Sequence, residues 1–135
     1  MSKKRNEQAS PRRANQGGSR RTMNSRQKGK RGEREWAAWL REHMGCEHAR
    51  RGQQYNGVEG EDVLDGFDVL HHEVKRVERL NIYEAMRQSI RDAKPGRVPI
   101  VAHRRNGDQW LVTIRASDMR EFAAAIRLME RSRAL

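Results

Sequence analysis

Cysteine, aromatic side chains and long apolar runs are all scarce in this chain of 135 residues. The single cysteine, Cys46, cannot form a disulfide within the chain, which is typical of proteins from a reducing compartment. No stretch approaches the roughly 20 consecutive apolar residues that a membrane-spanning helix needs. The sequence therefore predicts a cytoplasmic protein with no membrane segment.

The few histidines and aromatic residues also lack informative spacing. His71 and His72 are adjacent, so on a strand they would point to opposite faces, and no further pair has Cys-x-x-Cys or i,i+4 spacing. Zinc is therefore not expected. No aromatic run is suited to stacking single-stranded bases, so Trp36, Trp39 and Trp110 are predicted to be core or interface residues.

Acidic residues are nearly missing from the first 31 residues, which hold eleven Lys or Arg and one acid, Glu7. This segment supplies +10 of the net charge of +11, and it has too few apolar residues to offset the entropy of ordering. We expect residues 1–31 to be a disordered basic arm and residues 32–135 to form one domain. Such an arm is typical of nucleic-acid contact, although a solubility tail has the same composition.

Residues 32–135 alternate between helical and strand patterns. Apolar spacing predicts a helix over residues 33–44, and Asn81 and Ser117 are expected to cap helices over residues 82–93 and 118–129. Strands are predicted at 46–51, 63–64, 67–77, 98–103 and 109–114, with a polar loop at 53–60 and a hairpin turn at Asn106-Gly107. The order α-β-β-β-α-β-β-α predicts an α/β domain with a mixed sheet flanked by helices.

The stretch EDVLDGFDVLHHEVKRVE places five acids ahead of Lys75. On a strand, Glu73 and Lys75 would share one face, and a turn at Asp65-Gly66 would bring Asp62 beside Glu73. Carboxylates suit a hard cation such as Mg²⁺, and a lysine ammonium suits a phosphate. Taken alone, the same spacing is also that of an ion pair on a solvated strand face.

A longer series of motifs extends this pattern over residues 28–115. In order, the chain contains KGKRGERE, Arg50-Arg51, Asp62-Val63-Leu64, Glu73-Val74-Lys75, a predicted helix with Gln88, VPIVAHRR and WLVTI. The series resembles the PD-(D/E)xK nuclease superfamily, and within it the small Holliday junction resolvases of archaeal type and their phage relatives. The resemblance implies a restriction-endonuclease-like fold and a structure-selective DNA endonuclease active in DNA recombination and repair.

By the same resemblance, the catalytic residues are Glu33, Asp62, Glu73 and Lys75. The three carboxylates would bind Mg²⁺ or Mn²⁺, and Gln88 would be an accessory residue. Glu61 stands where the motif has proline.

Asp65 and Asp68 compete with Asp62 for the aspartate position. Asp62 is favoured because a hairpin fits between it and Glu73, and Asp65 is the second choice. Asp68 is too close along its own strand.

The implied partner is branched or duplex DNA, cut by a homodimer in the host cytoplasm if the protein is phage-encoded. The basic side chains expected to contact DNA are Lys28, Lys30, Arg31, Arg34, Arg50, Arg51, Arg76 and Arg79. Other interpretations are a repair, packaging or restriction nuclease of the same superfamily, a non-catalytic basic nucleic-acid-binding protein, and a ribosome-associated protein.

Overall fold

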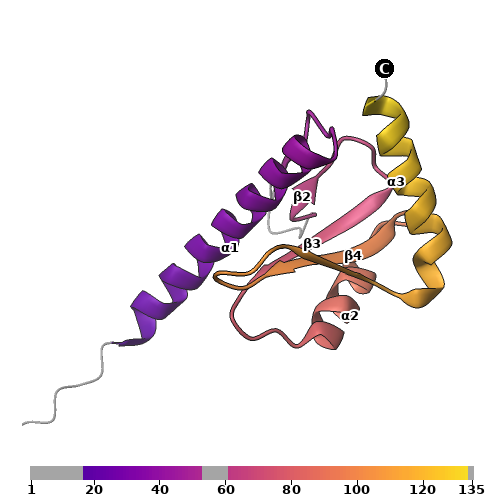
Figure 1. Cartoon of the computed structure of the whole chain (residues 1–135). Helices are drawn as coiled ribbons and strands as arrows, with labels where there is room; N and C mark the ends of the chain where they lie inside the picture. The colour runs from indigo at the N-terminus through magenta and orange to yellow at the C-terminus, as the bar shows by residue number, and fades with distance from the viewer. Residues whose placement is uncertain (1–16, 53–60, 134–135) are drawn as a thin grey trace, which may run out of the picture.

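The computed structural model describes residues 17–52 and 61–133, with side chains from Gln27 onward (Figure 1). Its α-helices are α1 (Gly17–His43), α2 (Ile82–Asp92) and α3 (Met119–Arg133), the last preceded by the 3₁₀ turn η1 (Ala116–Asp118). Its strands are β1 (Arg50–Arg51), β2 (Val63–Leu64), β3 (Leu70–Arg76), β4 (Val98–Arg104) and β5 (Leu111–Ile114). The expected order of helices and strands is confirmed.

The strands form one mixed sheet in the order β1-β2-β3-β4-β5. Strands β3 and β4 are parallel neighbours in register from Leu70 and Val98 to Arg76 and Arg104, and the other neighbouring pairs are antiparallel. A parallel pair needs a crossover connection, which α2 supplies. The mixed α/β sheet flanked by helices is therefore present as predicted from the sequence.

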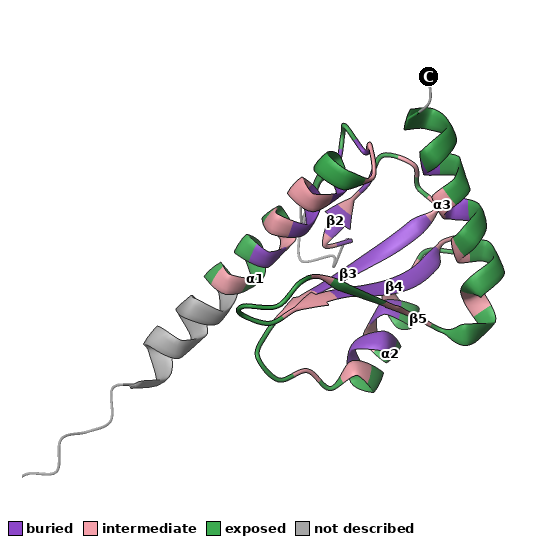
Figure 2. Cartoon of the chain, in the orientation of Figure 1, coloured by how far each residue is buried: buried purple, intermediate pink, exposed green. Residues whose placement is uncertain are grey.

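Helices α1 and α3 pack on one face of the sheet and α2 packs on the other (Figure 2). The main core lies under α1 and α3, where Trp36 and Leu40 meet Val74, Ile100 and Met129. On the opposite face, Ala85 and Met86 of α2 cover Val101 in a smaller core. Successive residues of β3 and β4 therefore alternate between two buried environments.

The first helix is longer than expected. It begins at Gly17, so residues 17–31 are helical, and the prediction of a disordered arm is wrong for that part of the chain. Gln, Arg, Lys and Met lose little side-chain freedom in a helix and can extend one already nucleated by the core-packed turns. Residues 1–16 of the predicted arm and the predicted loop at 53–60 lie outside the described residues.

Close packing of α1 on β3 depends on a glycine. A Cβ atom added at the buried Gly32 would lie 2.5 Å from the Cβ of Arg76. Arg76 in turn donates from Nε to Glu35 of α1 over 3.2 Å. The KRGERE segment therefore places α1 directly across the carboxyl end of β3.

Local turn chemistry sets the other boundaries. The Asn81 side chain accepts a hydrogen bond from the backbone N–H of Glu84, which confirms it as the N-cap of α2. Gly107 has φ +77°, as the hairpin turn between β4 and β5 requires. Ser117 lies inside η1 rather than capping a helix, because the chain makes a 3₁₀ turn before α3 begins.

Among the described residues, no helix is both long and apolar enough to cross a bilayer.

Candidate functional site

A cavity of about 690 Å³ opens at the carboxyl end of β3, between that strand, α1 and α2. Four of the side chains that line it are the predicted catalytic residues Glu33, Asp62, Glu73 and Lys75, and Gln88 is a fifth. In open α/β sheets, ligands bind in the crevice outside the carboxyl ends of the parallel strands. The fold therefore gathers residues from α1, the β2 edge, β3 and α2 at a position suited to ligand binding.

Strand geometry explains how Asp62 comes close to Glu73. Strands β2 and β3 pair antiparallel with Val63 opposite His72, so the preceding Asp62 lies across from Glu73. The Asp62 Oδ2 atom accepts a hydrogen bond of 2.8 Å from the backbone N–H of Val74. This bond holds the carboxylate at the edge of β3, immediately before β2 begins at Val63.

The Lys75 ammonium lies between α2 and the Glu73 carboxylate of β3. Its Nζ donates to Gln88 Oε1 over 2.9 Å and lies 3.4 Å from Glu73 Oε1. Glu73 is only 4% exposed. A cation fixed by a helix on one side and a buried carboxylate on the other is positioned to face a bound anion.

Negative charge accumulates around Asp62. Burial, followed by the charges of Glu73 and Glu33, raises the pKa of Asp62 from 3.8 to about 7, against the opposing effects of the Val74 N–H and Lys75. A carboxyl group that is costly to ionise beside other carboxylates is a common mark of a functional site. The cavity therefore favours a positively charged ligand near Asp62.

The site has the donor chemistry for a divalent cation. Mg²⁺ prefers carboxylate oxygens and commonly uses one or two of them, with water and substrate phosphate completing its shell. Asp62 and Glu73 offer such a pair. The described part of the chain contains no group of three or more His, Cys, Asp or Glu side chains arranged to enclose a metal ion.

Glu33 lines the same cavity but is already engaged. Its Oε2 accepts from Arg51 Nε over 2.5 Å. This pair links α1 to β1 and brings Arg51 toward the site from the strand edge.

Asp65 lies outside the cavity and is held by hydrogen bonds. Asp65 is 3% exposed and contacts His72 Nε2 through Oδ2 over 2.7 Å, and its Oδ1 accepts from the backbone N–H groups of Phe67 and Asp68. Burial acts to raise the pKa of Asp65, but the His72 interactions and these two N–H groups outweigh it and lower that pKa below 3.8. The Asp65 carboxylate is saturated by the protein, so the geometry favours Asp62 for the motif position.

Glu61 and Asp68 share one cation. Both lie in ion-pair contact with Arg97, which precedes β4. Glu61, in the position of the motif proline, is therefore a buried partner of Arg97 rather than a residue of the site.

The two adjacent histidines face opposite sides of the sheet, as the strand alternation predicts. His72 Nδ1 accepts from Trp36 Nε1 over 3.0 Å on the α1 face. His71 lies behind Glu73, with its Nε2 at 3.7 Å from Glu73 Oε2 and its Nδ1 at 4.0 Å from Glu61 Oε1. Among the described residues, neither ring nitrogen of this fully buried histidine has a hydrogen-bond partner.

Several of the basic residues predicted to bind DNA are paired within the protein. Lys28 lies 3.6 Å from Glu78, and Arg31 and Arg76 both contact Glu35. Lys30, Arg34, Arg50 and Arg79 have exposed side chains. Exposed cations therefore lie on α1, on β1 and beyond the end of β3.

Sequence reasoning missed the polar contacts behind the site. Arg97 stands 36 residues from Glu61, and nothing in the local pattern links them. One feature of the sequence could have predicted the hydrogen bonds that link Trp36, His72 and Asp65. The alternation of side chains along β3 directs His72 toward the same core as Val74.

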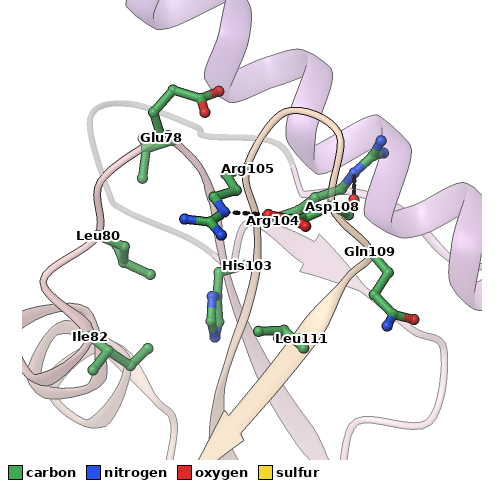
Figure 3. Close-up of a pocket in the computed structure, with 10 residues that line it drawn as sticks. Glu78, Leu80, Ile82, His103, Arg104, Arg105, Asp108, Gln109 and Leu111 are labelled. Carbon is green, nitrogen blue, oxygen red and sulfur yellow. Dashed lines mark hydrogen bonds and ion pairs between the residues drawn. The ribbon is translucent and has the colours of Figure 1, made fainter.

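A second cavity, of about 410 Å³, adjoins the first and shares Val77 and Glu78 with it. It lies between the β3–α2 connection and the β4–β5 hairpin (Figure 3).

No protein-family model, no curated protein and no solved structure matches this chain. Its function must therefore be argued from its residues.

Proposed function

We propose that the chain is a metal-dependent DNA endonuclease with a PD-(D/E)xK site, and that it resolves four-way DNA junctions. The observation that carries the proposal is the convergence of Asp62, Glu73 and Lys75 in one cavity, where burial, followed by the charges of neighbouring carboxylates, raises the pKa of Asp62 to about 7. A purely structural role would leave the acids satisfied by hydrogen bonds within the protein, as Asp65 is by His72 and two backbone N–H groups.

Asp62 and Glu73 would hold a Mg²⁺ or Mn²⁺ ion, with Glu33 beside them on α1. Such an ion, when bound, supplies stabilisation of charge on the phosphate and lowers the pKa of water. Lys75, fixed by Gln88 and Glu73, would place its ammonium against the phosphodiester where negative charge develops. The chain's own residues thus orient the reacting phosphate and the charge around it.

Positive charge over the same region supports a nucleic-acid substrate. Exposed Lys30 and Arg34 of α1, Arg50 of β1 and Arg79 beyond β3 would contact the DNA backbone without reading its sequence. Binding should then weaken steeply with added salt, because phosphate contacts release counterions. Two matched cuts across a junction require two sites, so the active form is proposed to be a two-fold homodimer.

The test is incubation of the purified chain with an end-labelled four-way junction, a linear duplex and a flap, each with Mg²⁺. We expect junction cleavage by the wild type and by Glu47→Gln, a control at an exposed acid outside the cavity. We expect none by Glu73→Gln. Preferred cleavage of the flap or duplex would indicate another nuclease of the superfamily.

The competing function is non-catalytic nucleic-acid binding, which the basic surface alone would support. It predicts junction binding without nicking in Mg²⁺, and no difference between the wild type and Glu73→Gln. That result would remove the nuclease proposal.

A further inference from the structure

The second cavity differs in chemistry from the first although they share a wall. Its lining combines aliphatic and polar side chains, with Leu80 and Ile82 on one side and Leu111 of β5 on the other (Figure 3). Val77 is the fourth aliphatic residue of the lining. Leu111 is 56% exposed, so its side chain is open to a ligand in this cavity. The second cavity therefore differs from the adjoining carboxylate cavity in that it offers aliphatic side chains beside its polar ones.

The charges around this second cavity cancel one another. Arg105 pairs with Asp108 (Figure 3), and Arg104 donates to the Asp108 carbonyl and contacts Glu35 of α1. Glu78 accepts from the backbone N–H of Asn106 and pairs with Lys28. A phosphate would find its lining already neutralised, so the chemistry favours an uncharged, flat or apolar group.

Besides the charged residues, the lining includes an imidazole and an amide. His103 and Gln109 line it, and burial lowers the pKa of His103, which favours a neutral imidazole. One imidazole nitrogen contacts the Thr113 hydroxyl over 3.0 Å. The imidazole and the amide can form hydrogen bonds with the edge of a nucleobase, and the aliphatic side chains can pack against its face.

Resting on the proposed function, we propose that this cavity holds one unstacked base of the DNA strand whose phosphate lies at Asp62, Glu73 and Lys75. Val77 and Glu78 line both cavities, so this cavity adjoins the proposed phosphate position, and about 410 Å³ is within the range of small-ligand pockets. The preferred substrate class is then DNA with an unpaired or easily unstacked nucleotide at the cut, since intact duplex would have to be opened first.

The experiment uses the full chain and matched variants on the two faces of β5. Leu111 lies opposite His103 and lines the cavity, whereas Val112, 41% exposed, lies opposite Ala102 and faces the other side of the sheet. The variants Leu111→Gln and Val112→Gln make the same chemical change in the same strand. Neither residue belongs to the proposed metal or phosphate site.

A four-way junction carrying 2-aminopurine at successive positions around the cut would first locate any base that unstacks on binding without metal. An abasic nucleotide at that position would then be compared with the intact strand by fluorescence anisotropy. We expect the abasic change to weaken binding to the wild type and to Val112→Gln by about tenfold, a typical worth of one base contact. We expect it to leave the affinity of Leu111→Gln unchanged.

Two results would overturn the subsite. One is that no 2-aminopurine position brightens on binding, and the other is an equal abasic penalty in the wild type and Leu111→Gln. Cleavage of the same intact junction in Mg²⁺ separates the two proposals. Cleavage without an abasic effect removes the subsite alone, whereas absence of cleavage removes the proposed function and the subsite with it.

Discussion

The two faces of strand β3 carry similar polar residues in opposite states. On the α1 face, His72 is bonded to Trp36 and Asp65, and Asp65 is further bonded by two backbone N–H groups. On the α2 face, the buried His71 has no hydrogen-bond partner among the residues that the structure describes, and Asp62 is both buried and close to the charges of neighbouring acids. The polar groups of His72 and Asp65 are therefore satisfied within the protein, whereas those of His71 and Asp62 leave an unmet electrostatic demand.

Buried polar groups are normally hydrogen-bonded, and natural proteins leave exceptions mainly where function requires them. The satisfied face contributes to stability, and the unsatisfied face is expected to contribute to binding. Substitutions on the two faces should therefore affect different properties.

The largest expected difference is in cleavage by two aspartate variants. Asp62→Asn should lower the rate of Mg²⁺-dependent junction cleavage at least about a hundredfold, because it removes a charge from the proposed metal site. Asp68→Asn should leave the rate within about twofold, because Asn tolerates its positive φ of 57° and its carboxylate lies outside the cavity. Single-turnover rates at matched protein concentration measure both, and equal rates would contradict the assignment of Asp62.

The next largest difference is expected between variants of the two histidines, in their free energy of unfolding. His72→Leu leaves Trp36 Nε1 and Asp65 Oδ2 without their partner, and should lower the free energy of unfolding by about 1–3 kcal/mol. His71→Leu breaks no hydrogen bond to a described residue and should change it by less than about 1 kcal/mol. Urea unfolding measures both, and a larger loss for His71→Leu would reverse the roles assigned to the two faces.

A smaller effect is expected in the pH dependence of stability. The folded pKa of Asp62 is about 7, above its usual 3.8, so between those values the folded chain holds a proton that the unfolded chain has lost. The stabilisation associated with this proton is complete below pH 4 and is lost as the pH rises through 7. In metal-free buffer, the melting temperature of Asp62→Asn should therefore gain on that of the wild type from pH 4 to pH 7 and level off above it.

Thermal melts at half-unit pH intervals give this comparison, with Glu47→Gln as a control that should follow the wild type. A constant gap between Asp62→Asn and the wild type at every pH would show that burial and neighbouring charges do not raise the pKa of Asp62 in the folded chain.

Part of this arrangement could be predicted from the sequence because it is local. Alternation along β3 separates His71, Glu73 and Lys75 from His72 and Val74, and a chain reversal between β2 and β3 brings Asp62 opposite Glu73. The reversal was expected, but it spans residues 65–69 rather than the two-residue turn at Asp65-Gly66, because β3 begins only at Leu70. Those features follow from the two-residue alternation of side chains along a strand and from one reversal of the chain direction.

Other features depend on residues that the local pattern does not connect. The contact between Glu61 and Arg97 forms only when the crossover through α2 places β4 beside β3. The early start of α1 was missed because low apolar content is a poor guide to a helix that continues from a packed segment. The second cavity needs Val77, Ile82 and Leu111 from three elements, and none of the three stands out in the sequence.

The decisive measurement is calorimetric titration of Mn²⁺ into the metal-free chain at pH 8, with no DNA present. We expect saturable binding by the wild type and by Asp68→Asn, and no measurable binding by Asp62→Asn or Glu73→Gln when circular dichroism shows both to be folded. Identical titrations for all four proteins, whether each binds Mn²⁺ or none does, would contradict a metal site on the α2 face of β3.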